Sequence, residues 1–307
     1  MIFRPVLLAV NHWMNEKQVM TTIQDLLSYG IALLKKVGHE SASLEARMLL
    51  EDVLGVDRAT LYAYPEREVG EALAQQYRDM IARRVQGEPV AYLTGHREFY
   101  GLDFLVDRRV LIPRPETELL VDVALSLLRE RLDKGQSPIV ADIATGSGII
   151  PITLAVEEPR LLSLYASDIS SDALVVARQN CELHHVEQRV HLLQGDLLAP
   201  LPEAVDFLTA NLPYVGIDET DLLSVDVYLY EPHIALFSGP HGLDLLQRLC
   251  QDLRQSGMLR DKAVLLLEIG FRQREPLERI LYGLWPHATI VCKQDYAGWD
   301  RLMQVYL

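Results

Sequence analysis

The chain has 307 residues, 49% of them hydrophobic, and its 43 acidic residues outnumber 29 basic ones to give a net charge of −14. This length allows one large or two ordinary domains with a sizeable core. The acidic balance argues against a broad face that grips nucleic-acid phosphates. The three cysteines, Cys181, Cys250 and Cys292, are scattered and odd in number, so we expect neither disulfides nor a zinc site but reduced thiols in the cytoplasm.

The N-terminal third is predicted to be helical after a short tail. Residues 1–20 show no clear hydrophobic period and lack the basic region and cleavage site of a signal peptide. From residue 21 to residue 95, apolar side chains recur at helical spacing, with Met48 on the second apolar stripe and Leu73 on the third, which runs from 69 to 85. No apolar run approaches ~18 residues, so no membrane span is expected.

Residues 96–113 change in character. Aromatic and β-branched residues up to Ile112 surround a glycine, which suits a β-hairpin that links two domains. The run Pro113-Arg114-Pro115-Glu116-Thr117-Glu118 then precedes a predicted helix over 119–132. Glu116 in a first turn favours the positive end of a helix. The alternative interpretation places Arg114 and Glu116 at a functional cleft.

Residues 114–307 alternate between predicted strands and helices. The expected strands cover 139–143, 161–166, 190–193, 206–210 and 263–269, and segments 288–291 and 302–305 suit a hairpin at the sheet edge. Such alternation is typical of an α/β fold in which a mainly parallel sheet carries helices on both faces.

A glycine loop follows the first of these strands and opens a helix. Its residues are Ala144-Thr145-Gly146-Ser147-Gly148. Glycines let the backbone approach a ligand, and the helix N–H groups favour a carboxylate or phosphate, although a plain tight turn explains the same residues. The pattern G-x-G-x-x-G is not met, because Pro151 takes its sixth place, and this argues against a nicotinamide cofactor.

Two acidic residues end the next two strands. Asp168 stands where an acid can accept both hydroxyls of a ribose, or it could cap the following helix together with Ser170. Asp196 would then lie beside an adenine ring, with Leu197 as an apolar flank. An ordinary turn is the alternative for Asp196.

The segment Asn211-Leu212-Pro213-Tyr214 follows the strand over 206–210. Pro213 ends strand pairing because it has no N–H, so an amide, a carbonyl and an aromatic ring are presented at a strand's carboxyl end. Open α/β sheets bind ligands there, although an Asn in a turn is the simpler interpretation. Asn211 Oδ1 and the Leu212 carbonyl could accept the hydrogens of an amide nitrogen, against whose plane Tyr214 could pack.

Together these residues resemble the class I S-adenosylmethionine-dependent methyltransferases. Residues 111–118, 211–215, 231–236, 244–245, 267–270 and 295–301 further resemble the peptide chain release factor N5-glutamine methyltransferases, over about residues 21–307. The resemblance implies a Rossmann-like, seven-stranded methyltransferase domain at 114–307, a β-hairpin linker at 96–113 and a helical substrate-recognition domain at 21–95. It also implies methylation of the glutamine in the Gly-Gly-Gln loop of class 1 release factors, with S-adenosylhomocysteine as product.

The resemblance also implies roles for residues. Residues 144–148, Asp168, Asp196, Leu197 and Asn211 would hold the cofactor. Residues 211–214, Arg114 and Glu116 would hold the substrate. A cytoplasmic monomer with no metal and no direct nucleic-acid partner is expected.

The chain departs from the family pattern at two places. Ala144 stands where the family usually has glycine, which matters if its φ is positive, and Leu212 stands where the family usually has proline.

Three other functions stay open. The alternatives are a glutamine methyltransferase for a large-subunit ribosomal protein, an adenine-N6 nucleic-acid methyltransferase and a silent cofactor-binding scaffold.

Overall fold

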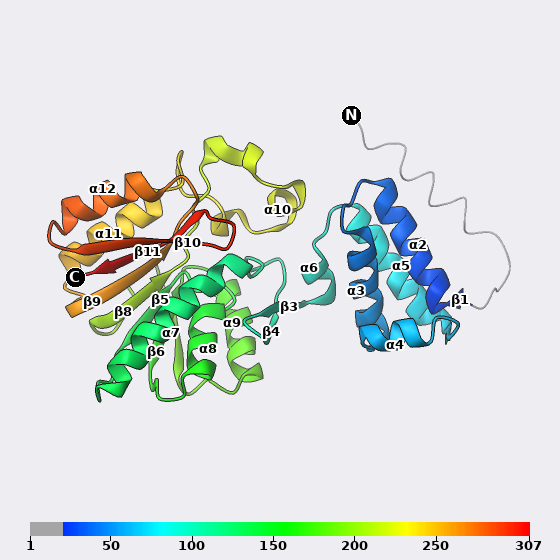
Figure 1. Ribbon diagram of the computed structural model, residues 1–307, viewed down its shortest axis with the longest axis horizontal. Coiled ribbons are helices and arrows are strands. Elements are labelled where there is room, and N and C mark those ends of the chain that lie inside the picture. Colours follow the sequence, from blue (N-terminus) through cyan, green and yellow to red (C-terminus); the bar gives the residue numbers. More distant parts are fainter. Residues whose placement is uncertain (1–20) are drawn as a thin grey trace. The chain divides into compact units, whose positions relative to one another are not determined.

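The computed structural model describes residues 21–307, and the predicted N-terminal tail lies outside them. The chain divides into two compact units between Thr94 and Gly95. The first unit is helical and the second is an α/β unit with one large sheet (Figure 1).

The first unit is built from helices that bury a common core. They are α2 (Ile23–Lys36), α3 (Ala42–Leu54), α4 (Arg58–Ala63), α5 (Glu71–Val85) and α6 (Val90–Thr94), and β1 (Thr21–Thr22) pairs with β2 (Glu68–Val69). α2 begins after Thr22 because Thr22 and Asp25 each accept a hydrogen bond from the other's backbone N–H, which forms a capping box.

Some details predicted for these helices are wrong. Val69 belongs to β2, so the third predicted helix begins only after Gly70. Met48 is 38% exposed and Leu73 is 40% exposed, although both were expected on apolar stripes. Adjacent helical residues point about 100° apart, so the core is filled by the neighbours Leu49 and Ala74 instead.

The second unit opens with the predicted hairpin, which is shorter than expected. β3 (His96–Phe99) pairs with β4 (Leu102–Leu105) around Tyr100 and Gly101. Residues 110–112 are not a strand, so that part of the prediction is wrong. They lead instead into η1 (Pro115–Thr117) and α7 (Glu118–Asp133).

The large sheet has seven strands in the order β10, β11, β9, β8, β5, β6, β7. In chain order they are β5 (Val140–Ile143), β6 (Leu164–Asp168), β7 (Val190–Gln194), β8 (Val205–Ala210), β9 (Leu259–Glu268), β10 (Thr289–Gln294) and β11 (Asp300–Tyr306). β5 to β9 pair in parallel, and β11 pairs antiparallel with both of its neighbours, β9 and β10. The α/β class and the edge hairpin formed by β10 and β11 are therefore confirmed.

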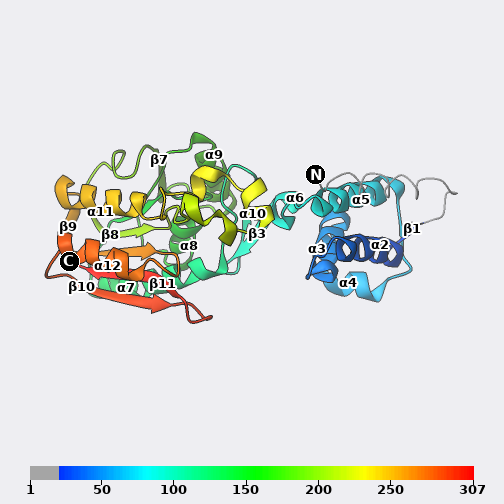
Figure 2. The same ribbon diagram turned by 90° about the horizontal axis from the view of Figure 1, so that it is seen from above.

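Helices cover both faces of this sheet (Figures 1 and 2). The helices α7, α8 (Ile149–Glu157) and α9 (Ser171–Leu183) pack with one core cluster, and α11 (Asp244–Ser256) and α12 (Arg274–Leu284) pack with another. Neighbouring residues of one strand serve opposite clusters, as Val140 and Ala141 do, because strand side chains alternate between faces. The remaining elements are η2 (Ile217–Leu222), α10 (Val225–Tyr230) and η3 (His233–Ala235).

The strand order reverses beside β5. The chain runs outward from β5 to β6 and β7, then crosses back to β8 on the other side of β5. Ile143 at the end of β5 pairs with Ser167 on one side and with Ala210 on the other. The loops that leave these three strands therefore begin side by side, at the position where open α/β sheets bind ligands.

The packing of Gly30 generates a test of the helical core. A methyl group added to Gly30 would lie 2.1 Å from the hydroxyl of Tyr77, which is fully buried and donates to the Ala46 carbonyl at 3.2 Å. We expect Gly30→Ala to lower the free energy of unfolding by about 1–3 kcal/mol, because Tyr77 must move. In α12, Gly283 has nothing within 4 Å, so Gly283→Ala should raise stability by up to about 1 kcal/mol. Denaturant unfolding measures both, and effects of the same sign would contradict this packing.

Candidate functional site

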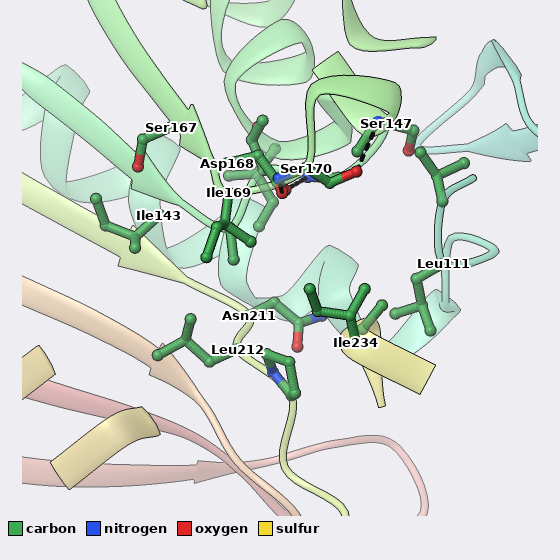
Figure 3. A pocket seen from close by; sticks show the side chains of 18 of the residues that line it. Leu111, Ile143, Ser147, Ser167, Asp168, Ile169, Ser170, Asn211, Leu212 and Ile234 are labelled. Carbon is green, nitrogen blue, oxygen red and sulfur yellow. Dashed lines mark hydrogen bonds between the residues drawn. The ribbon is translucent and has the colours of Figure 1, made fainter. Parts of the chain in front are cut away.

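A cavity of about 280 Å³ opens at the carboxyl ends of β5, β6 and β8 (Figure 3). Eleven residues predicted from the sequence line it: Arg114, Ala144, Thr145, Gly146, Ser147, Asp168, Asp196, Leu197, Asn211, Leu212 and Pro213. Gly148, Glu116 and Tyr214 are not among the lining residues. The structure thus brings together most of a set that is spread over about 100 positions of the chain.

The glycine loop reaches the cavity through three left-handed residues. Ala144 has φ +58°, Gly146 has φ +57° and Gly148 has φ +82°. Gly148 precedes α8, where an added Cβ would lie 2.8 Å from Ile152 Cδ1, so the position requires glycine for packing as well as for conformation. Ala144 carries a strained backbone where the family usually has glycine, so this departure from the pattern does affect the loop.

Asp168 ties the glycine loop to the end of β6. Its carboxylate accepts hydrogen bonds from the Gly146 N–H at 2.8 Å and from the Ser170 N–H at 2.9 Å. Ser170, in turn, caps α9 by accepting from the Ala173 N–H at 3.1 Å, so Asp168 is not the helix cap. Burial raises the pKa of Asp168 against these backbone hydrogen bonds. Each carboxylate oxygen has two acceptor positions, so the group keeps capacity toward the cavity.

Asp142 lies behind the loop, within β5, and is not among the site residues predicted from the sequence. It is buried and accepts a hydrogen bond from Thr209 Oγ1 at 2.6 Å, while its Oδ2 has no partner among the described residues. Burial raises the pKa of Asp142 to about 7. A second carboxyl group, Asp168, adds to this shift by repulsion.

Asp196 and Leu197 form another part of the wall. Asp196 makes an ion pair with Arg248 of α11, which also lines the cavity and which sequence reasoning missed. Leu197 is buried with φ +48°, and its carbonyl accepts a hydrogen bond from Ser167 Oγ at 3.1 Å. The apolar side chain of Leu197 therefore lies next to the polar residue Asp196 in the cavity wall.

Asn211 follows β8 and faces the same cavity. Its Nδ2 donates to Thr117 Oγ1 at 3.2 Å, and Leu212 and Pro213 beside it are buried. Burial raises the pKa of Tyr214 to about 12, and the Tyr214 carbonyl accepts from Gln273 Nε2 at 2.8 Å. Tyr214 is half-buried and is not among the residues that line the cavity.

The segment over residues 111–118 separates the two residues for which a cleft was predicted. Arg114 lines the cavity and pairs with the buried carboxylate of Glu231, which also accepts from the Ile112 N–H at 3.1 Å. The side chain of Glu116 is exposed. Between them, Thr117 is fully buried and contacts Asn211, a link across 94 positions that no local pattern signals.

Glu268, at the end of β9, completes the surroundings of Asn211. It is buried, and its Oε2 has no hydrogen-bond partner in the part of the chain that the structure describes. Burial raises its pKa to about 7, while polar contacts with Thr117 and Asn211 and the charge of Arg301 oppose the shift.

Two further classes of site are absent from residues 21–307. No cluster of three or more His, Cys, Asp or Glu side chains there could hold a metal ion. Over the same residues, none of the helices has the length and apolar character needed to cross a membrane.

Comparison with known proteins matches this arrangement to one family. Residues 25–95 match the PrmC N-terminal domain and residues 118–228 match the methyltransferase small domain. The release factor glutamine methyltransferase of Koribacter versatilis is 38% identical over 92% of this chain and 97% of its own length. That of Moorella thermoacetica is 40% identical over 93% and 98%.

A solved structure shares the fold. The hMettl16 catalytic domain in complex with MAT2A 3'UTR hairpin 6 has a TM-score of 0.54 and 16% identity, over 74% of this chain and 81% of that one. At this identity the likeness concerns the fold alone, and it supports the Rossmann-like arrangement of the sheet.

The strain at Ala144 can be tested by removing its Cβ. A left-handed alanine costs about 1–2 kcal/mol, and the greater freedom of glycine in the unfolded chain offsets about half of that. We therefore expect Ala144→Gly to raise the free energy of unfolding by about 0.5–1 kcal/mol, measured by urea titration. Ala155→Gly, inside α8, should lower it by about 1 kcal/mol. A loss of stability in both variants would show that φ at 144 is not strained.

The buried Asp142 predicts a pH-dependent stability. Its folded pKa of about 7 lies well above the ordinary value of an aspartate carboxyl, about 3.9, so the folded state holds the proton more tightly and loses stability as pH rises between these values. Asp142→Asn does not titrate. Its advantage over the wild type should grow from about pH 4 and level off above about pH 7, where it is on the order of 4 kcal/mol.

Melting temperatures across this pH range provide the measurement. Asp252→Asn, at an exposed position of α11, is the control and should stay within about 0.5 kcal/mol of the wild type throughout. A pH-independent difference for Asp142→Asn would mean that Asp142 is ionised in the folded protein like an exposed carboxyl.

Proposed function

The chain belongs to the release factor glutamine methyltransferases, and from this premise we propose that its cavity binds S-adenosylmethionine and presents the methyl group to a release-factor glutamine. The activity is that of an S-adenosylmethionine-dependent protein glutamine methyltransferase. One observation carries the assignment of the site: Asn211, at the end of β8, faces the same cavity as the glycine loop at the end of β5.

The residues of the cavity fit an adenosine-containing methyl donor. The volume of about 280 Å³ is close to the lower end of ordinary ligand pockets, about 300 Å³. Asp168 has acceptor positions left for ribose hydroxyls, Asp196 and Leu197 offer a polar and an apolar contact for the adenine, and the backbone of residues 144–148 can hold the amino-acid end. When bound, S-adenosylmethionine supplies an electrophilic methyl group on a sulfonium sulfur and is converted to S-adenosylhomocysteine.

Asn211 and Leu212 would orient the glutamine. The nitrogen of an amide is a poor nucleophile because its lone pair is delocalised, and no side chain of ordinary pKa can deprotonate it beforehand. Asn211 Oδ1 and the Leu212 carbonyl would accept the two N–H hydrogens and so align the nitrogen with the methyl group. The proton released on transfer leaves along these hydrogen bonds toward solvent. Alignment should therefore contribute more to the rate than acid–base catalysis.

The substrate would be the Gly-Gly-Gln loop of a class 1 release factor, with the helical unit over residues 21–95 as a recognition domain. The named relatives that cover nearly the whole chain support this choice. The further substrate contacts proposed are Arg114, which lines the cavity, Glu116 close to it in the sequence, and Tyr214 directly after Pro213. We place the protein in the cytoplasm as a monomer. We propose no nucleic-acid partner, because release factors are proteins and the net charge is −14.

The experiment compares three acceptors under identical conditions. The protein is incubated with isotope-labelled S-adenosylmethionine and, separately, a class 1 release factor, ribosomal large-subunit proteins and nucleic acid. We expect label in the release factor, located by mass spectrometry as one methyl group on the glutamine of its Gly-Gly-Gln motif. Label confined to ribosomal protein or to nucleic acid would overturn the proposal in favour of those substrates.

Asn211→Ala tests the proposed site. Loss of the acceptor should lower kcat by about 10²–10³-fold and leave the affinity for S-adenosylmethionine nearly unchanged, because the adenosine and ribose contacts are made by other loops. Gln136→Ala, which removes an exposed amide elsewhere, is the matched control and should keep full activity. Wild-type turnover in Asn211→Ala would remove Asn211 from the mechanism.

A further inference from the structure

We infer that Thr117 and Glu268 are positioning residues that fix the orientation of the Asn211 amide, so that its oxygen faces the cavity. The inference rests on the proposed function, since it concerns the hydrogen-bond acceptor offered to the glutamine nitrogen. Thr117 lines the cavity next to Asn211 and Glu268 does not, and both would act through Asn211.

The orientation of this amide matters because its two ends differ only in chemistry. A rotation of 180° about the last side-chain bond exchanges oxygen and nitrogen with almost no change in shape. With the oxygen toward the cavity, Asn211 accepts an N–H of the substrate amide. With the nitrogen there, two donors would face each other, and the substrate would be held in the wrong position or repelled.

The contact with Thr117 alone does not select one orientation. Asn211 Nδ2 lies 3.2 Å from Thr117 Oγ1, but a hydroxyl can either donate or accept a hydrogen bond. Thr117 is completely buried in η1, directly before α7, so the backbone holds its side chain in place. A third group must therefore determine the direction in which the hydroxyl hydrogen points.

Glu268 supplies that direction. An ionised carboxylate only accepts hydrogen bonds, and this one is buried beside Thr117 and Asn211 with Oε2 lacking any partner among the described residues. The Thr117 hydroxyl and the Asn211 NH₂ can both donate toward it. When Thr117 gives its hydrogen to Glu268, its lone pairs are left for Asn211 Nδ2, and Asn211 Oδ1 must point away.

One cation opposes the effect of burial, which raises the pKa of Glu268 to about 7. Arg301, on β11, is the nearby cation, and it is held by two hydrogen bonds to Asp295 Oδ2 at 3.1 and 3.2 Å and one to the Ile269 carbonyl at 3.3 Å. Glu116 opposes ionisation by repulsion, and Tyr214 is neutral with its pKa raised to about 12. Arg301 therefore offsets part of the cost of burying the carboxylate.

A crossed pair of variants separates the hydroxyl of Thr117 from its volume. Thr117→Val keeps the shape and loses the hydroxyl, whereas Thr117→Ser keeps the hydroxyl and loses a buried methyl group. We expect Thr117→Val to lower kcat for release-factor methylation by about 10- to 100-fold, with the KM for S-adenosylmethionine unchanged. Thr117→Ser should retain kcat within about 3-fold of the wild type even though its melting temperature falls.

The outcomes distinguish the inference from the proposed function. If activity follows melting temperature instead, so that the serine variant loses kcat and the valine variant keeps it, Thr117 is a packing residue and the inference fails. The proposed function stands in that case, because the wild type still methylates the release factor. A wild type that leaves the release factor unmodified would instead overturn the proposed function.

Glu268→Gln tests the source of the direction. A glutamine has the same shape but offers both donors and an acceptor, so it no longer dictates which way the Thr117 hydroxyl points. We expect kcat to fall by about 10-fold with the KM for S-adenosylmethionine unchanged. Wild-type kcat in this variant would overturn the role of Glu268.

Discussion

The parallel pairing of β5 with β6 on one side and β8 on the other is the constraint on which the site depends. The pairs Ile143 with Ser167 and Ile143 with Ala210 set three strand ends at one level. Apart from Arg114 and Glu116, the residues proposed to bind ligand lie at or after these ends or that of the neighbouring β7. Because the chain turns outward on one side of β5 and returns on the other, the loops diverge and leave a cavity between them.

Buried carboxyl groups surround this cavity, and burial raises the pKa of Asp142, Asp168 and Glu268. Burying such groups costs stability unless hydrogen bonds compensate, and two of the three keep an oxygen without a hydrogen-bond partner within residues 21–307. What these groups gain is orientation: Asp168 fixes the glycine loop through Gly146, and we assign Glu268 the same function for the amide of Asn211. Burial of these carboxyl groups thus lowers stability at the places where hydrogen bonds must hold polar groups in a defined orientation.

Part of the backbone strain lies at the cavity, which two of the five left-handed non-glycine residues in residues 21–307 line. Ala144 and Leu197 are left-handed non-glycine residues, and both line the cavity. Strain of this kind persists only when surrounding contacts over-determine it, as the hydrogen bond from Ser167 to the Leu197 carbonyl does. The loops of the site are therefore held by the sheet rather than by their own preferences.

Elements whose signal is local can be predicted from the amino-acid sequence. Such local signals are the strand runs, the glycine loop, Asp168 and the Asn211–Pro213 turn, which are recognised from consecutive residues. The parallel topology then places the strand ends together. The same patterns predicted the α/β class and the edge hairpin.

Which side chains contact one another depends on the tertiary structure and could not be predicted from local patterns. The contact of Thr117 with Asn211 spans 94 positions, and the pairing of Arg248 with Asp196 spans 52. Helical periodicity could not tell that Ala74 rather than Leu73 faces the core, nor that Tyr214 packs outside the cavity lining, since both depend on neighbours from other elements. Periodicity fixes a direction relative to one element's own axis, whereas a site is made where several elements converge.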